Sequence, residues 1–144
     1  MVLIVCIGNR LVEADSLGPR VHDQLSCAPL PDGVGLLDGG LRGLNLLGSV
    51  EGASRLVFVD ALRGFAVDGQ VSVVEGTGAI DRADEGFGHS SGLGYLLRAL
   101  EVGCEGPAPR WVVVGAQGAA DEALVAAVAR RALDLARGPG AETR

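Results

Sequence analysis

VLIVCIGN, residues Val2–Asn9, opens the chain with an unbroken apolar run that ends at a Gly-Asn turn. A short continuous run of this kind is typical of a central parallel strand that is covered on both faces. Cys6 falls inside the run, where we expect it to act as a small buried apolar side chain. We expect the other elements of the fold to pack around this strand.

Strand-like and helix-like segments alternate along the rest of the chain, which predicts an α/β layer fold. Residues 70–75 alternate apolar and polar side chains, as an edge strand does. The pattern predicts further strands over Val34–Leu37, Arg55–Asp60, Gln70–Glu75 and Arg110–Ala116, and helices over about Leu17–Leu25, Leu93–Leu100 and Asp121–Arg137.

The spacing of apolar residues also predicts which helix faces are buried. Asp15 or Ser16 is expected to cap the first helix, with Pro19 in its first turn. Three buried stripes are predicted: Leu41, Leu44 and Leu47; Leu93, Leu96, Leu97 and Leu100; and Leu124, Ala127, Val128, Ala132 and Leu135.

Length and composition exclude several classes of protein. With 144 residues, 48% of them apolar, the chain can bury the core of one domain without disulfides or a structural metal. Its apolar runs are far shorter than the roughly 20 residues that cross a bilayer. The first segment lacks the basic flank and cleavage site of a signal peptide. We therefore expect a cytoplasmic protein, and a monomer.

The charged residues and cysteines exclude several kinds of binding site and catalysis. A net charge of −6 without a basic cluster argues against nucleic-acid binding. All 12 basic residues are arginine, which excludes Schiff-base lysine chemistry and a lysine-type phosphate loop. Cys6, Cys27 and Cys104 form no CxxC pair, so no cysteine-built zinc site is expected. No tightly bound organic cofactor is expected either.

Three residues, Asp15, Asp60 and His89, each lie where a predicted strand or loop meets a Gly-rich turn. In open α/β sheets, ligands bind outside the carboxyl ends of the strands. If the strands that precede Asp15 and end at Asp60 are parallel neighbours, both carboxylates point into one crevice. Two carboxylates and one imidazole with open coordination positions suit nickel, zinc or iron(II).

Each of these residues also has a simpler structural interpretation. Asp15 could cap the following helix, and His89 could be a solvated loop residue. Asp60 is more informative, because a carboxylate beside buried valines costs several kcal/mol unless it is paired or metal-bound. The other histidine, His22, lies beside Asp23 on the first predicted helix and is expected to face solvent.

Asn9, Gly39 and Gly40 are candidates for contact with a peptide substrate. The Asn9 amide could polarise a scissile carbonyl, or the residue could simply form the turn. Gly39 and Gly40 could admit a substrate backbone into the crevice, or they could also form a plain turn.

The order and spacing of these motifs resemble those of the hydrogenase maturation proteases, which trim the C-terminal extension from the large subunit of nickel–iron hydrogenases. The chain departs from that pattern at Cys6, where the family often has glycine, and at Ala14, where it often has an acid. The resemblance covers nearly the whole chain and rests on Ile7–Gly18, Asp38–Leu44, Val59–Ala61 with Gly64 and Asp68-Gly69, His89 with Gly92-Leu93, and Val112–Gln117.

The resemblance implies a single-domain three-layer sandwich over residues 1–137. Its sheet would be twisted, five-stranded and mostly parallel, with one antiparallel edge strand and helices on both faces. Residues 138–144 would be a flexible tail. The resemblance also implies that Asp15, Asp60 and His89 bind nickel carried by the hydrogenase large-subunit precursor, so the metal is transient and orients the substrate. Asp15 or Asp60 could then activate water as a general base.

Two other functions stay open on the sequence. Asp15 and Asp60 could share one proton in a metal-independent, aspartic-type peptidase. Alternatively, the protein could be a non-catalytic nickel-binding factor for hydrogenase assembly. Cleavage that survives His89→Ala but not Asp60→Asn would favour the first, and nickel binding without any change in precursor mass would favour the second.

Overall fold

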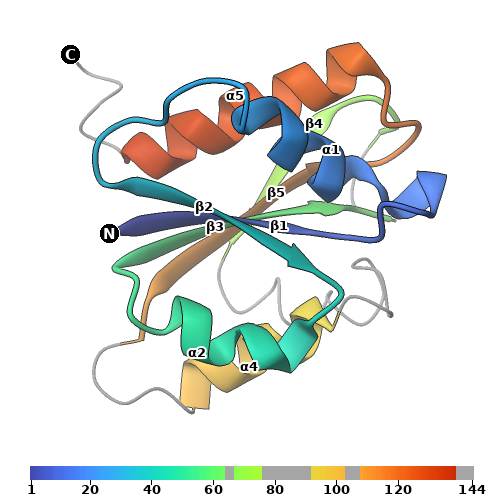
Figure 1. The fold of residues 1–144 in the computed structure, drawn as a ribbon. Helices are drawn as coiled ribbons and strands as arrows, with labels where there is room; N and C mark the ends of the chain where they lie inside the picture. The colour runs from blue at the N-terminus through green and yellow to red at the C-terminus, as the bar shows by residue number, and fades with distance from the viewer. Residues whose placement is uncertain (64–66, 76–91, 103–107, 139–144) are drawn as a thin grey trace.

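The protein folds as a central sheet between two layers of helices in a computed structural model that describes residues 1–63, 67–75, 92–102 and 108–138 (Figure 1). The sheet has the strand order β2-β1-β3-β5-β4. Its strands are β1 (Val2–Ile7), β2 (Val34–Gly40), β3 (Arg55–Ala61), β4 (Val71–Glu75) and β5 (Arg110–Ala116).

The pairing of the strands confirms the predicted fold class. β1 lies between β2 and β3 and is parallel to both, and β3 is parallel to β5. β4 pairs with β5 in the antiparallel direction and forms one edge of the sheet. The result is the expected five-stranded, mostly parallel sheet with one antiparallel edge strand. Both faces carry helices, as a largely parallel sheet requires.

Successive residues of β1 and β3 point to opposite faces, which divides the core in two. One half lies under α1 (Leu17–Leu25) and α5 (Glu122–Arg137), and the other lies over α2 (Leu47–Val50) and α4 (Leu93–Val102) (Figure 1). The first half contains Ile4, Cys6, Val57 and Val59, and the second contains Val5, Ile7, Leu56 and Phe58. Cys6 is therefore the buried apolar side chain that the sequence predicts.

The predicted elements form with small changes at their ends. β2 continues past Leu37 to Gly40, and β3 runs one residue past Asp60. The predicted helix over 121–137 begins at Glu122, because Asp121 is its N-cap and accepts a 2.8 Å hydrogen bond from the backbone N–H of Leu124. All four leucines predicted for α4 are buried.

The buried stripe predicted from Leu41, Leu44 and Leu47 is wrong. The chain forms a 3-10 turn, η2 (Gly43–Leu46), before the short helix α2, and this turn begins after Leu41. Because the turn rotates the chain, Leu46 and Val50 are buried, whereas Leu41 and Leu44 are exposed. In the long helix α5, the predicted stripe is correct at Leu124, Val128 and Ala132, but Ala127 is exposed and Val125, Ala129 and Ala136 are buried.

Two further observations concern the helices. No helix within the described ranges combines the length and apolar character needed to cross a bilayer. α5 ends at Arg137, and Gly138 donates a backbone hydrogen bond to the carbonyl of Leu135. Of the predicted tail, 139–144 lies outside the described residues.

Candidate functional site

The sheet brings Asp15 and Asp60 to the same edge. β1 and β3 are parallel and paired through Cys6 and Val59, so they end side by side. Asp60 is the next residue of β3, and Asp15 returns to the end of β1 through the 3-10 turn η1 (Glu13–Asp15). The predicted condition for convergence, that the two strands are parallel neighbours, is therefore met.

Two glycines fix Asp15 against the end of β1. A side chain at Gly8 would place its Cβ 2.3 Å from the carbonyl oxygen of Asp15, and one at Gly18 would place it 2.0 Å from the carbonyl oxygen of Ile7. Only glycine allows backbones to approach this closely. The backbone N–H of Asn9 then donates to the Asp15 carbonyl at 2.9 Å and to its Oδ2 at 3.1 Å.

Asp15 is thus held by the turn before it and does not cap the following helix. Ser16 occupies the N-cap position of α1, and its side chain caps no helical amide. Its hydroxyl donates instead to the carbonyl of Glu13 at 2.8 Å. The Asp15 residue is only 6% exposed. The helix-cap interpretation of Asp15 is therefore wrong, and Ser16 takes the N-cap position without the predicted capping hydrogen bond.

Asp60 is completely buried at the end of β3. Its Oδ1 accepts a 2.8 Å hydrogen bond from the backbone N–H of Ala61. Its Oδ2 is buried and has no hydrogen-bond partner in the described part of the chain. Burying a carboxylate oxygen without a partner lowers the stability of the folded protein. The presence of Asp60 here therefore indicates a role in function and not in stability. The alternation along β3 places Asp60 on the face of Leu56 and Phe58, the face that α4 covers.

Burial raises the pKa of both carboxyl groups, and the charge of Asp15 adds to the effect on Asp60. Burial raises the pKa of Asp60 well above its usual value, and the negative charge of Asp15 raises it further, against smaller opposing effects of the Ala61 N–H and Arg63. Burial also raises the pKa of Asp15, opposed by the Asn9 N–H and by Arg63. A pair of this kind favours binding either a proton or a metal cation.

The third predicted ligand, His89, lies outside the described residues. The start of α4, which follows it in sequence, is fixed near the end of β2, because a Cβ at Gly92 would lie 2.9 Å from the Cα of Gly43. Among the residues that the structure describes, no group of three or more His, Cys, Asp or Glu side chains is placed to hold a metal ion. The described part of the site therefore consists of two carboxylates.

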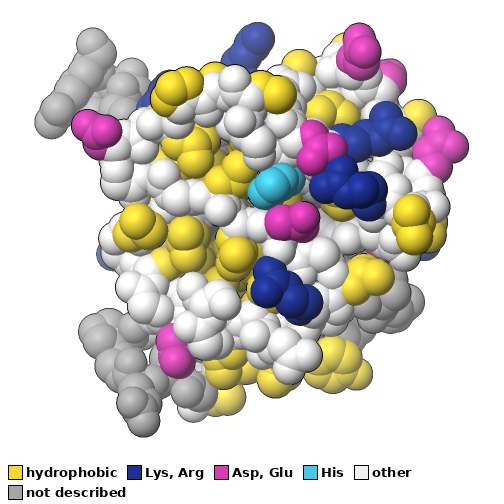
Figure 2. Space-filling model, viewed as in Figure 1, with side chains coloured by type: hydrophobic (Ala, Val, Ile, Leu, Met, Phe, Trp, Pro, Cys, Tyr) yellow, Lys and Arg dark blue, Asp and Glu magenta, His cyan; other side chains and the backbone are white. Residues whose placement is uncertain are grey.

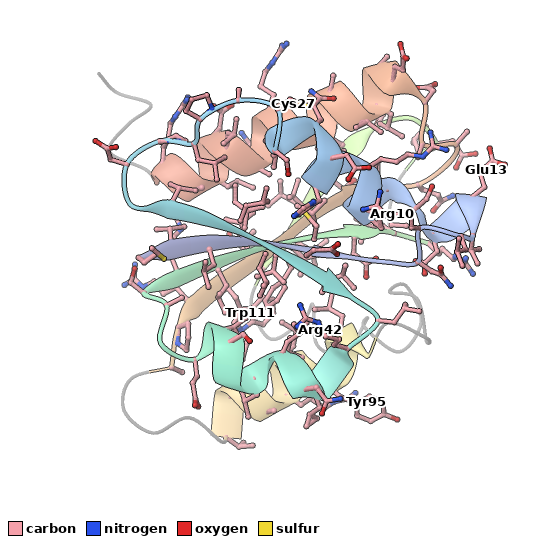
Figure 3. All side chains as sticks on the ribbon, in the orientation of Figure 1. Arg10, Glu13, Cys27, Arg42, Tyr95 and Trp111 are labelled. Carbon is pink, nitrogen blue, oxygen red and sulfur yellow. The ribbon has the colours of Figure 1, made fainter. Side chains whose placement is uncertain are left out.

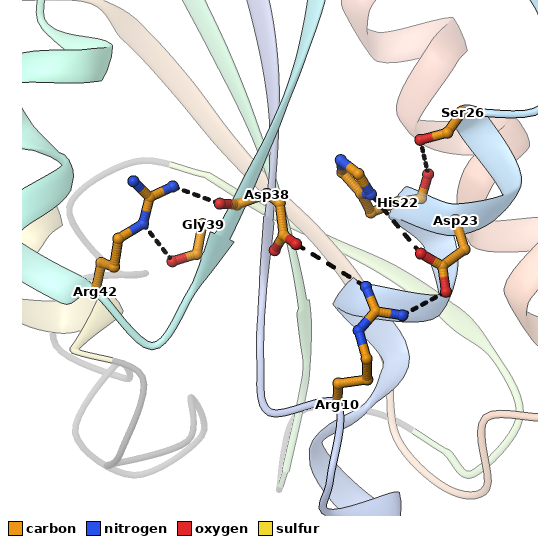
Figure 4. A network of polar contacts seen from close by, with 7 residues as sticks. All are labelled: Arg10, His22, Asp23, Ser26, Asp38, Gly39 and Arg42. Carbon is orange, nitrogen blue, oxygen red and sulfur yellow. Dashed lines mark hydrogen bonds and ion pairs between the residues drawn. The ribbon is translucent and has the colours of Figure 1, made fainter.

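The other histidine, His22, belongs to a separate polar network on the surface (Figures 2 and 4). Its Nδ1 lies 3.9 Å from Oδ1 of Asp23. Arg10, from the loop after β1, forms ion pairs with Asp23 at 2.5 Å and with Asp38 at 3.9 Å. Arg42 donates to the carbonyls of Asp38 and Gly39 (Figure 4). The expectation that His22 faces solvent is only partly correct, since its side chain is 23% exposed.

The three residues proposed for substrate approach differ in their surroundings. Asn9 forms a turn, with its side-chain oxygen accepting a 2.9 Å hydrogen bond from Leu11 N. Gly39 is buried, and a Cβ there would lie 2.7 Å from Cδ1 of Ile7, so packing inside the protein explains this glycine. Gly40 has a φ of +53° and open space around it. Of the two glycines, only Gly40 leaves room for another chain.

A cleft of about 550 Å³ opens beside the two carboxylates. It is lined by the residues that precede Asp15 and those that follow Asp60, although neither aspartate lines it. Glu13, one of its lining residues, projects at the rim of the molecule (Figure 3). The remaining lining residues are Ala14, Ala61, Leu62, Arg63, Asp68, Ala116, Gln117, Gly118 and Ala119. No local pattern marks Arg63 as part of the cleft, because four separate segments of the chain form it.

Comparison with known proteins identifies relatives of this arrangement. The family model for hydrogenase maturation proteases (HycI) matches residues 19–131, a range that includes Asp60 and His89 and begins after Asp15. Over 62 residues, or 42% of this chain, the sequence is 36% identical to the hydrogenase 2 maturation protease of Escherichia coli and 37% identical to the hydrogenase expression/formation protein HupD of Bradyrhizobium diazoefficiens. The matches span only 38% and 32% of these two relatives.

Solved structures show the same fold over nearly the whole chain. The chain is similar to the hydrogenase maturating endopeptidase HybD from E. coli, with a TM-score of 0.74 and 25% identity over 93% of this chain and 88% of that one. It also shares its fold with the [NiFe] hydrogenase maturation protease HybD of Thermococcus kodakarensis, with a TM-score of 0.65 and 21% identity over 94% of this chain and 96% of that one.

Proposed function

This chain belongs to the hydrogenase maturation protease family, and from that premise we propose that it is an endopeptidase. Its substrate is the large-subunit precursor of a nickel–iron hydrogenase, from which it removes the C-terminal extension after nickel insertion. The nickel ion is part of the substrate and guides recognition, with Asp15, Asp60 and His89 as its ligands on the protease. The observation that carries this proposal is the buried Oδ2 of Asp60, which has no hydrogen-bond partner among the described residues.

The carboxylate pair suits a transient cation. Burying a carboxylate away from water costs free energy unless an opposite charge or hydrogen bonds compensate it. The N–H of Ala61 donates one such hydrogen bond to Asp60. A divalent ion brought by the precursor would supply the missing charge. Carboxylate oxygens and imidazole nitrogen are ligands that nickel accepts. Because the ion leaves with the product, the protease does not need a closed four-ligand cage.

The residues around the pair can then act on the peptide bond. A carboxylate oxygen that is not bound to the metal takes a proton from water, whose oxygen attacks the scissile carbonyl carbon. The same carboxyl group returns that proton to the departing amine. Asn9 positions Asp15 through its backbone N–H, and the described residues offer no acceptor to its side-chain nitrogen, which is free to donate to a peptide carbonyl. Gly40 leaves space for the substrate main chain.

Substitution of the three ligands tests this proposal. Nickel-loaded precursor is incubated with the wild type and with Asp15→Asn, Asp60→Asn and His89→Ala, and the mass of the large subunit is followed with time. Asp32→Asn is the matched control, because Asp32 is an exposed aspartate away from the site. The proposal predicts loss of the mass decrease in all three variants and normal processing by the control. Normal processing by Asp60→Asn would contradict it.

One observation favours a second candidate, a metal-independent peptidase in which Asp15 and Asp60 share a proton. The pKa of Asp60 is raised by burial and, next, by the charge of Asp15, as expected for such a pair. In that mechanism His89 is dispensable. The same series distinguishes the two, since continued cleavage by His89→Ala together with loss in Asp60→Asn would favour the shared proton.

A further inference from the structure

Arg63 extends the candidate site into the neighbouring cleft. It follows Asp60 by three residues, is exposed, and lines the cleft together with Glu13 and Asp68. Arg63 also acts electrostatically on both carboxylates, since its charge lowers the pKa of Asp15 and of Asp60. A cation therefore stands beside the pair, at the entrance to the space that a bound peptide would occupy.

Arg63 has no partner among the residues that the structure describes. Within the described ranges it makes no hydrogen bond or ion pair, whereas Arg10 and Arg42 near the same edge are engaged by Asp23 and by backbone carbonyls. Asp68, an acidic residue of the same cleft, accepts a 2.7 Å hydrogen bond from Nε2 of Gln117. A guanidinium that lines a cleft and has no partner in the described part of the chain is available to a ligand.

The cleft itself suits an extended peptide. Its volume of about 550 Å³ falls within the range of about 300–1,000 Å³ for ligand sites. Small residues contribute much of its lining, namely Ala14, Ala61, Ala116, Gly118 and Ala119. Short side chains leave room for a main chain to lie close to the protein.

We infer that this cleft binds the C-terminal extension of the precursor and that Arg63 binds a carboxylate of that extension, either an acidic side chain or the terminal carboxylate. The inference rests on the proposed function and adds a specificity-determining residue to it. In the free protein, Arg63 favours the ionised forms of Asp15 and Asp60. When the divalent ion of the substrate neutralises this pair, the charge of Arg63 is left to be balanced by an anion of the same substrate.

Binding of nickel-loaded precursor to immobilised protease tests the role of Arg63. The comparison is between Arg63→Gln and the matched control Arg130→Gln, which removes an equally exposed arginine from a separate groove between α5 and β4. Loss of a charged hydrogen bond predicts a Kd for Arg63→Gln that is higher by about tenfold or more. Arg130→Gln should bind like the wild type. Nickel titration by calorimetry should show that Arg63→Gln binds the metal no more weakly than the wild type.

Two altered precursors identify the carboxylate. In one, the acidic side chains of the extension are changed to amides; in the other, the terminal carboxylate is amidated by semisynthesis. One of them should weaken wild-type binding by the same factor and abolish the difference between wild type and Arg63→Gln. Equal binding by the two arginine variants, or an Arg63 effect that persists on both precursors, would overturn the inference. Failure of the wild type to bind any nickel-loaded precursor would instead reject the proposed function, and the inference with it.

Discussion

Within the described ranges of the chain, the carboxylate of Asp60 accepts a single hydrogen bond, from the N–H of Ala61. Valine or alanine at the end of β3 would continue the pattern of a buried strand without this cost. The sequence indicated the residue for that reason, since a charged group directly after an apolar run is unusual. The structure adds the second carboxylate, Asp15, whose position depends on Gly8 and Gly18 rather than on any local charge pattern. Residues that function demands are commonly unfavourable for stability.

The first prediction concerns the stability of the site. Asp60→Asn keeps the shape of the side chain and its hydrogen bond from Ala61, but it removes the buried charge. The free energy of unfolding should rise by on the order of 1 kcal/mol at pH 7, while processing of the precursor is lost. Chemical denaturation measures this change. A fall of more than about 2 kcal/mol would show that the carboxylate supports the fold.

The second prediction concerns pH. The pKa values of Asp15 and Asp60 are raised from 3.8 in the folded protein, so their protonated forms contribute stability below about pH 4. That contribution is lost as the pH rises through the folded-state pKa values, by at most about 1.4 kcal/mol per pH unit for each proton. The stability advantage of Asp60→Asn should therefore grow from pH 4 upward. A constant difference across this range would contradict the raised pKa of Asp60.

A carboxyl-carbon NMR titration separates the two causes of the raised pKa of Asp60, which are burial and the charge of Asp15. Asp15→Asn removes the charge that raises the pKa of Asp60 and leaves its burial in place. The pKa of Asp60 should fall in this variant but stay above its usual value. Because the effect of a charge decreases with distance, an unchanged pKa would mean that the two groups do not share one site.

At the scale of elements, close contacts between backbones hold the site together. Gly18, in α1, packs on the carbonyl of Ile7, and Gly115, in β5, leaves 1.9 Å between a hypothetical Cβ and the carbonyl oxygen of Asp60. The last residues of β1 and β3 therefore cannot shift without moving a neighbouring element. This packing explains how a turn and a strand end can hold two carboxylates in a fixed arrangement.

The third prediction tests this packing. Gly18→Ala should lower the free energy of unfolding by at least about 2 kcal/mol, because the added methyl group meets backbone atoms that have no space to move. Gly48→Ala is the matched control, since that helical glycine has nothing within 4 Å of the added Cβ. The control should be more stable by about 0.5–1 kcal/mol. Equal effects of the two substitutions in chemical denaturation would contradict the account of Gly18.

The sequence predicts elements best where burial is continuous. β1, β3 and β5 are covered on both faces, so their residues are apolar without interruption, and the predicted bounds are correct or nearly so. It predicts η2 and α2 poorly, because three leucines at equal spacing fit a helical stripe while the chain actually turns at Gly43. In α5, alanine carries too little hydrophobic signal to distinguish the exposed Ala127 from the buried Ala129.

At the scale of the whole molecule, the topology of the sheet determines which site residues can be predicted from the sequence. That Asp15 and Asp60 approach one edge follows from parallel strands, which the pattern predicts, and the family resemblance led to the same residues. The cleft beside them is formed by four segments that are distant in sequence, and no local motif marks Arg63 as part of it. The role proposed for Arg63 depends on which residues the fold brings together, so the structure was needed to infer it.

The most direct test of the account compares two forms of one substrate. The wild-type protease is incubated with the large-subunit precursor prepared with and without nickel, and mass spectrometry follows the removal of the extension. In the proposed mechanism the cation of the substrate compensates the two aspartates, so only the nickel-loaded precursor is expected to be shortened. Equal cleavage of both forms, or of neither, would contradict metal-guided recognition at Asp15 and Asp60.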